Sequence, residues 1–194
     1  MLGKAPAKSA VDDPDQPLVR RIAQGDEHAA AILMDRHLPS ILGLACNMLG
    51  DVVEAEDVAQ EAFLKAWLHA GKWQPGKAKF ATWLHRVSIN LCYDKLRKRR
   101  EIYMDVLPER MDEQNLDAEM QVGGTELAKS VRAAISTLAP RQRAAISLCH
   151  LQEMGNIEAA KVMEISVEAL ESLLGRGRRK LREILQNQIT ELRG

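Results

Sequence analysis

Aromatic residues and cysteines are scarce in this sequence, and both shortages narrow the fold and the chemistry. Aromatic residues make up 4% of the 194 residues and hydrophobic residues 46%, which predicts a core of Leu, Ala and Val, as in helical bundles. Cys46, Cys92 and Cys149 are an odd number without CxxC or CxxxH spacing. We therefore expect buried free thiols, and neither a disulfide framework nor a zinc site.

Motifs of catalysis and of membrane insertion are also missing. The sequence has no HExxH, P-loop, Ser/His/Asp order or glycine-rich dinucleotide motif, so we expect no enzyme, no metal and no cofactor. The longest nearly apolar run, 41–49, is interrupted by Asn47 and is too short to span a bilayer. The N-terminus has no apolar signal-peptide core, which predicts a cytoplasmic protein.

Net charge is absent, but the charges are segregated along the chain. The 27 Lys and Arg residues balance 27 Asp and Glu residues. An acidic stretch at 101–126 separates two basic blocks, which are Arg86, Lys95, Arg97, Lys98, Arg99 and Arg100, and then Arg176, Arg178, Arg179, Lys180 and Arg182. Basic blocks of this kind favour polyanionic partners, whatever the sum of charges.

The spacing of apolar residues predicts an all-α fold with two small helical domains. Apolar residues recur every three or four positions over 18–100, with a helix opened by Asp51, and again over 127–194. The proline-containing segment 1–17 cannot bury enough surface to order itself, so we predict a disordered tail. The acidic stretch 101–126, with Pro108 and a Gly pair, predicts a flexible linker.

A helix-turn-helix is predicted in the second domain. Asn156 and Ser166 are good N-caps for two helices joined by about three residues, and the second helix ends in the second basic block. Its apolar residues face one side, which leaves the following outward: Glu168, Glu171, Ser172, Gly175, Arg176 and Arg179. Glu164 departs from the motif, because it stands in the turn where Gly most easily adopts the left-handed conformation.

Two internal glycines distinguish this second helix from a plain amphipathic one. Gly175 and Gly177 each cost about 1 kcal/mol relative to Ala in a helix interior, which a plain solvated surface would not need. Periodicity alone nevertheless also fits a solvated amphipathic helix that closes a small bundle.

Four segments, in order, carry a resemblance to a known family. They are GDVVEAEDVAQEAFLKAW, FATWLHRVSINLCYDKLRKRR, LAPRQRAAISL and EAAKVMEISVEALESLLGRGRRKLR. Together they resemble the extracytoplasmic-function (ECF) group of bacterial sigma factors in the sigma-70 family. The resemblance implies a region 2 domain at 18–100, which binds the RNA polymerase clamp and the minus-10 promoter element. It also implies a region 4 domain at 127–194, which binds the minus-35 element.

The resemblance also implies roles for individual residues. The face that binds core polymerase would consist of Asp57, Gln60, Glu61 and Leu64. The minus-10 contacts would be Lys77, Lys79, Arg86, Asn90, Arg97 and Lys98, with Arg99 and Arg100 as further phosphate contacts. The minus-35 contacts would be Ser166, Glu168, Glu171, Ser172, Gly175, Arg176 and Arg179. Trp83 could help to separate DNA strands, but it adjoins the apolar stripe, so we expect a core role.

Two positions in the second helix differ from the family pattern, and one of them suggests a specific chemical role. Many relatives carry cations where this chain has Glu171 and Leu173. A carboxylate can accept a hydrogen bond from cytosine N4, so we hypothesise that Glu171 exchanges affinity for a cytosine preference.

These observations predict a stress-responsive sigma factor that directs transcription initiation. Its expected partners are core RNA polymerase, promoter DNA and an anti-sigma factor. Two alternatives stay open at this point. One is a stand-alone helix-turn-helix regulator that acts as a dimer, and the other is a sigma mimic that sequesters an anti-sigma factor.

Overall fold

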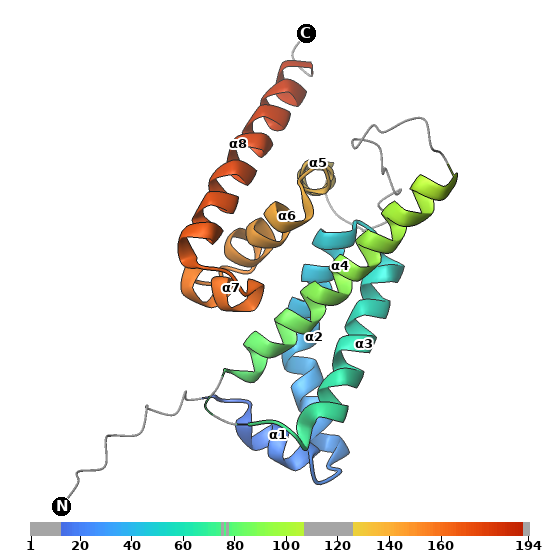
Figure 1. Ribbon diagram of the computed structural model, residues 1–194, viewed down its shortest axis with the longest axis vertical. Helices are drawn as coiled ribbons and strands as arrows, with labels where there is room; N and C mark the ends of the chain where they lie inside the picture. The colour runs from blue at the N-terminus through green and yellow to red at the C-terminus, as the bar shows by residue number, and fades with distance from the viewer. Residues whose placement is uncertain (1–12, 75, 77, 107–125, 192–194) are drawn as a thin grey trace, which may run out of the picture.

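The computed structural model describes residues 13–74, 76, 78–106 and 126–191, and over these residues it is helical without strands (Figure 1). The first domain consists of α1 (Gln16–Ile22), α2 (Glu27–Leu49), α3 (Val52–Ala70) and α4 (Phe80–Val106). The second consists of α5 (Glu126–Ser136), α6 (Pro140–Ile146), the π-helical turn η1 (Ser147–Leu151), α7 (Asn156–Met163) and α8 (Val167–Glu191). The predicted all-α fold is confirmed.

Local capping explains where several of these helices begin and end. The Asp51 carboxylate accepts a hydrogen bond from the Glu54 amide at 2.8 Å, so Asp51 is the predicted cap of α3. Just before it, Gly50 ends α2 with a left-handed φ of 71°, which glycine adopts without strain. Ser166 caps α8 through the Ala169 amide at 3.2 Å, as predicted. The prediction for Asn156 is wrong, because Gly155 is the N-cap of α7 and Asn156 is its first residue.

Two of the predicted segment boundaries need correction. Asp13 and Asp15 are buried, at 7% and 2% exposure, and α1 begins at Gln16, so the end of the predicted tail 1–17 belongs to the first domain. Residues 1–12 lie outside the described residues. In the predicted linker 101–126, α4 continues as helix to Val106 and α5 already begins at Glu126, while 107–125 lie outside the described residues.

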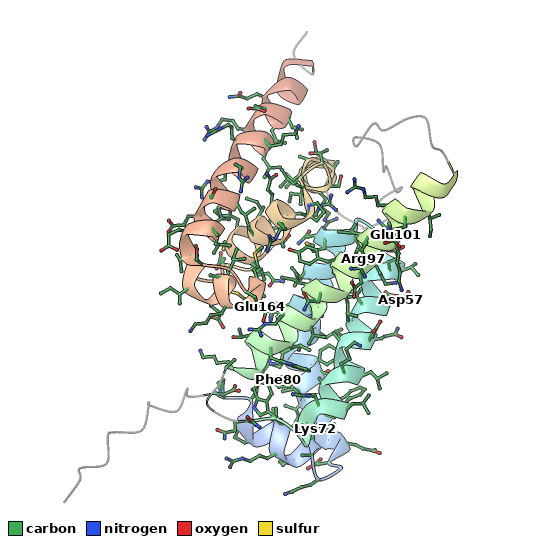
Figure 2. All side chains as sticks on the ribbon, viewed as in Figure 1. Asp57, Lys72, Phe80, Arg97, Glu101 and Glu164 are labelled. Atoms are coloured by element: carbon green, nitrogen blue, oxygen red, sulfur yellow. The ribbon has the colours of Figure 1, made fainter. Side chains whose placement is uncertain are left out.

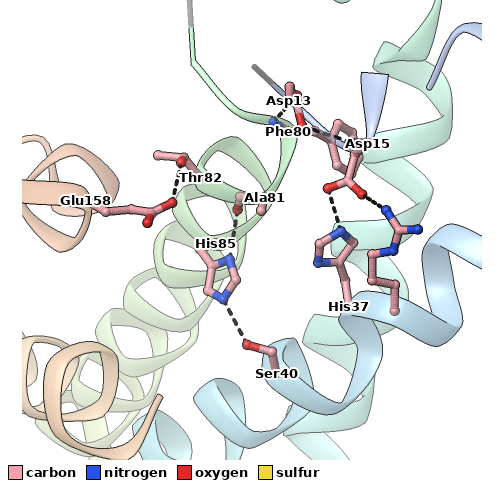
Figure 3. A network of polar contacts seen from close by, with 10 residues as sticks. Asp13, Asp15, His37, Ser40, Phe80, Ala81, Thr82, His85 and Glu158 are labelled. Carbon is pink, nitrogen blue, oxygen red and sulfur yellow. Dashed lines mark hydrogen bonds and ion pairs between the residues drawn. The ribbon is translucent and has the colours of Figure 1, made fainter. Parts of the chain in front are cut away.

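A polar network fixes residues 13–15 to α2 and to the start of α4 (Figure 3). The Asp13 carboxylate accepts a hydrogen bond from the Phe80 amide at 2.7 Å. The Asp15 carboxylate contacts the His37 ring at 2.8 Å and also pairs with Arg36 of α2. These contacts to His37 and Arg36 lower the pKa of Asp15, because together they outweigh the opposing effect of burial, which is the largest single influence. The residues before α1 therefore tie α2 and α4 together.

The hydrophobic core continues from one domain into the other. Buried residues of α2 and α4, including Met48 and Ile89, form one cluster with buried residues of the second domain such as Leu148, Val162 and Leu170. In Figure 1, α7 lies beside the N-terminal part of α4, where Thr82 and Arg86 contact it. By length and composition α2 could cross a membrane, but it packs against α1, α3 and α4 as a core helix of this bundle.

Candidate nucleic-acid interface

The outer face of α3 exposes the four residues predicted to bind polymerase. Asp57, Gln60, Glu61 and Leu64 are all exposed, while the opposite side of the helix is buried in the first domain. Leu64 is 51% exposed, and the same face also exposes Val53 (69%) and Leu68 (74%). This surface therefore combines carboxylates with exposed apolar side chains, as a protein-binding surface does.

Some of the predicted DNA-contacting residues of the first domain are exposed, and others are held by contacts with other parts of the protein. Lys79, Asn90, Arg97 and Lys98 are exposed. Among the described residues, Arg97 makes ion pairs with two residues of its own helix, Asp94 at 2.9 Å and Glu101 at 3.8 Å (Figure 2). Such exposed pairs hold a side chain weakly, so a phosphate could displace them. Lys77 lies outside the described residues.

Arg99 has an internal role rather than the predicted phosphate contact. Its guanidinium makes a two-pronged ion pair with the Glu54 carboxylate, at 2.6 and 3.2 Å, and donates to the Leu49 carbonyl at 3.0 Å. The side chain is 20% exposed. Arg99 therefore fastens the end of α4 to the turn between α2 and α3, because a bidentate pair of this kind fixes both partners.

Arg86 faces the second domain. Its guanidinium lies 2.9 Å from the Glu164 carboxylate and donates to the Lys161 carbonyl at 3.0 Å. The side chain is 31% exposed, against 62% for Glu164. Figure 2 places Glu164 at the side of α4, between the two domains. Residues of the second domain therefore already bind Arg86, which was predicted to contact minus-10 DNA.

Trp83 belongs to an aromatic cluster at the start of α4. It stacks on His69, with ring centroids 5.0 Å apart and planes at 12°, and it also contacts Trp73 and Phe80 at 6.0 and 5.7 Å. The side chain is half-buried and packs against the core of the first domain. The expected core role of Trp83 is confirmed.

The second helix of the helix-turn-helix presents the predicted set of residues outward. Ser166, Glu168, Glu171, Ser172, Arg176 and Arg179 are exposed, and Gly175 is half-buried. Leu170 and Leu174 on the opposite side are buried, at 0% and 3% exposure. Glu168 lies at the N-terminus of α8, where its own amide and the Ser166 hydroxyl stabilise the carboxylate and lower its pKa. The helix thus begins acidic and continues basic along one open face.

The two glycines of α8 occupy different surroundings. A Cβ added at Gly177 would lie 3.0 Å from Cγ1 of Ile146, so Gly177 lets α8 pack closely on α6. A Cβ added at Gly175 would meet no heavy atom within 4 Å. Packing therefore explains Gly177, and Gly175 stays available at the open face.

Each of the two domains matches a known protein family. The family described as Sigma-70 region 2 matches residues 33–102, and Sigma-70, region 4 matches residues 128–181. The chain is 30% identical to the ECF RNA polymerase sigma factor SigW of Bacillus subtilis (strain 168), over 87% of this chain and 95% of SigW. This protein belongs to the ECF sigma factors.

Other relatives support the same family. The ECF chain is 32% identical to the RNA polymerase sigma-H factor of Pseudomonas aeruginosa, over 91% of this chain and 96% of that protein. The structure of CnrH in complex with the cytosolic domain of CnrY superposes with a TM-score of 0.68 at 27% identity, covering 90% and 99% of the two chains. The fold is shared as well with the sigma factor RpoE from Bartonella quintana, solved with the anti-sigma factor NepR, at a TM-score of 0.65 and 23% identity over 80% and 96%.

Sequence reasoning missed the tertiary contacts of three residues of this sigma factor, although it had placed Glu164 in the turn that favours a left-handed residue. Glu164 does adopt the left-handed conformation, with φ 54° and ψ 45°. Arg143 is buried and donates to the carbonyls of Met48, at 2.5 Å, and Leu138, at 3.1 Å. Burial, and secondarily the charge of Arg99, lowers the pKa of Arg143 to about 10. Asp13 is the third, and its contact with α4 has no local sequence signal.

All three cysteines are free thiols, as predicted, but the prediction that they are buried holds only in part. Cys92 is buried, and burial raises its pKa to about 12, whereas Cys46 and Cys149 are half-buried. In the part of the chain that the structure describes, no group of three His, Cys, Asp or Glu side chains is placed to hold a metal.

Proposed function

We propose that this ECF sigma factor directs transcription initiation in the cytoplasm by three surfaces. The outer face of α3 binds the clamp of core RNA polymerase, the exposed polar residues of α4 hold melted minus-10 DNA, and α8 binds the minus-35 element. The observation that carries the proposal is the open face of α8, where a helix-turn-helix exposes Ser172, Arg176 and Arg179 while Leu170 and Leu174 are buried.

In vitro transcription with core RNA polymerase tests the proposal as a whole. The purified chain with core enzyme should initiate from promoters that share an upstream motif, mapped by their start sites. Arg176→Ala and Arg179→Ala should each weaken initiation, since each removes a phosphate contact. Tight duplex binding by the isolated chain as a dimer, without any effect on core enzyme, would instead support a stand-alone regulator.

The polymerase-binding face of α3 has its own control on the same helix. Asp57→Ala and Leu64→Ala should reduce binding to core polymerase in a pull-down or a fluorescence titration. Glu56 is also exposed, but it lies at the edge of this face, about 100° around the helix from Asp57 and about 40° from Gln60. Glu56→Ala should therefore reduce binding to core polymerase less than Asp57→Ala and Leu64→Ala do, and equal losses in all three variants would argue against a defined face.

Glu171 is proposed to determine base selectivity at the minus-35 element. It is exposed on the first turns of α8, on the face that this proposal assigns to the major groove. Glu171→Ala should reduce the preference for cytosine at one base pair by about 1–3 kcal/mol of discrimination. A uniform gain in affinity over all sequences would show charge repulsion alone. Binding to a panel of duplexes that vary the minus-35 element distinguishes the two results.

An anti-sigma factor is the proposed regulator. The relative CnrH was solved with the cytosolic domain of CnrY, so a protein partner on this fold has a precedent. Affinity purification from unstressed cells should recover the chain with a second protein besides polymerase. Recovery with polymerase alone would refute this part of the proposal.

A further inference from the structure

The strongest feature that the proposed function leaves unexplained is the contact between α7 and α4. Two side chains of α4 that are one turn apart both meet the helix-turn-helix. The Thr82 hydroxyl donates to the Glu158 carboxylate at 3.1 Å, as Figure 3 shows. Arg86 pairs with Glu164 at 2.9 Å and donates to the Lys161 carbonyl at 3.0 Å. Both ends of α7 are thereby fastened along one face of α4.

Glu164 is an unusual residue for its position. It follows α7 in the left-handed region, with φ 54° and ψ 45°, which disfavours any residue that carries a Cβ. Gly would adopt this conformation without strain. At Glu164 the ion pair with Arg86 gives the carboxylate of this strained turn an interaction that a glycine could not make.

The ion pair resembles the contact that DNA would make. A guanidinium binds the oxygens of a carboxylate and of a phosphate in the same way. In this structure Arg86 is incompletely satisfied, because its Nε is buried and has no hydrogen-bond partner among the described residues. A phosphate with several free oxygens can satisfy Arg86 better than Glu164 does. The contact is therefore suited to being displaced.

Further contacts hold the two domains in this arrangement. Gln152 donates to the Ser40 carbonyl at 2.6 Å, and Arg143 donates to the Met48 carbonyl at 2.5 Å. Asn90, the predicted base-edge contact on α4, lines a cleft together with Arg141 and Glu164 of the second domain. The N-terminal part of α4, from Thr82 to Asn90, thus faces the helix-turn-helix, whereas Arg97 and Lys98 further along the helix stay exposed.

We propose that the turn of the helix-turn-helix is an intramolecular inhibitor of minus-10 binding. In the free chain Glu164 occupies Arg86 in place of a DNA phosphate, so α7 and single-stranded DNA compete for one face of α4. This inference rests on the proposed function, because it takes Arg86 as a DNA contact.

The chain contains a matched control for the test. Glu153 is the other non-glycine residue with positive φ among the described residues, at 53°, and it is exposed just before α7. Glu153→Gln and Glu164→Gln change the net charge equally and keep the same type of strained backbone. Only Glu164→Gln removes an ion pair with Arg86.

Hydrogen exchange measures the contact without DNA. In the full-length chain, Glu164→Gln should speed amide exchange in peptides that cover 82–90 and 157–164, relative to both wild type and Glu153→Gln. Equal exchange in the three proteins would overturn the proposed contact. This readout does not depend on whether the chain is a working sigma factor.

The competition between α7 and DNA is measured by the binding of a fluorescein-labelled single-stranded oligonucleotide. The oligonucleotide carries the non-template minus-10 strand of a promoter mapped for this chain. Glu164→Gln should raise the affinity of the free chain about two- to five-fold, as expected for a partly exposed ion pair. Glu153→Gln should change affinity less, and Glu164→Gln should have no effect in an Arg86→Ala background. Equal gains in both Gln variants, or a full effect without Arg86, would refute the competition. If core polymerase and the chain initiate nowhere, the proposed function fails, while hydrogen exchange still decides the contact.

Discussion

Gly175 and Gly177 lie two positions apart on α8, yet a methyl group added at each should have opposite effects on stability. At Gly175 the added Cβ meets no heavy atom within 4 Å, so Gly175→Ala should stabilise the fold by about 1 kcal/mol through helix propensity alone. At Gly177 the added Cβ lies 3.0 Å from Cγ1 and 3.3 Å from Cδ1 of Ile146, which is itself buried at 2% exposure.

The overpacking at Gly177 should exceed the gain in helix propensity. Inserting a methyl group into a well-packed core costs about 1–3 kcal/mol, against the same gain of about 1 kcal/mol. Gly177→Ala should therefore destabilise the fold by about 1 kcal/mol. The two variants should differ by about 1–3 kcal/mol, which is the cost of crowding Ile146.

Urea unfolding followed by far-UV circular dichroism measures both variants. A double variant provides the control. In an Ile146→Ala background the added methyl at residue 177 has room, so Gly177→Ala should become neutral or stabilising there. If Gly177→Ala stabilises the unmodified protein as much as Gly175→Ala does, α8 is not closely packed on α6, and the packing explanation of this glycine is refuted.

Three further predictions concern stability. Asp13→Ala should lower the free energy of unfolding by about 1 kcal/mol through loss of the contact with the Phe80 amide, while Asp13→Asn should keep most of it; thermal unfolding would show equal stabilities if the contact is unimportant. Arg99→Ala should cost about 1.5–3 kcal/mol because its hydrogen bonds to Glu54 and Leu49 are lost, whereas the exposed Arg100→Ala should be neutral in the same assay. Burial lowers the pKa of His85 from its ordinary 6.5, so below pH 6.5 the unfolded chain takes up a proton that the folded chain does not, and stability falls. Urea unfolding at pH 7.5 and pH 5.5 should show this loss in the wild type and a smaller loss in His85→Gln.

Local patterns in the sequence were sufficient to predict the helices and the outward faces. The three- and four-residue spacing places Leu170 and Leu174 inside and Arg176 and Arg179 outside, and the structure agrees. Asp51 was predictable as a cap because its partner amide is three residues away. Signals of this kind act within one or two helical turns, so the sequence alone contains them.

The errors concern residues whose partners are far away in the chain. Asp13 was assigned to a tail because the amide that donates a hydrogen bond to it, that of Phe80, lies 67 residues later. Arg99 was assigned to DNA because its partner Glu54 is 45 residues distant and on another helix. The turn residue Glu164 looked like a defect of the motif until its ion pair with Arg86 was visible. Such contacts depend on tertiary packing, which no local period encodes.

The core that continues from α2 and α4 into the second domain limits which second domains from other proteins could replace the native one. A chimaera that takes its second domain from another sigma factor would place foreign side chains against Met48 and Ile89 and would have to supply an equivalent of Arg143 for the Met48 carbonyl. Promoter specificity is therefore not freely interchangeable between relatives by exchanging whole domains. Substitutions confined to the outward residues of α8 would leave the seam between the domains intact, and they are the safer route to a sigma factor with a new minus-35 preference.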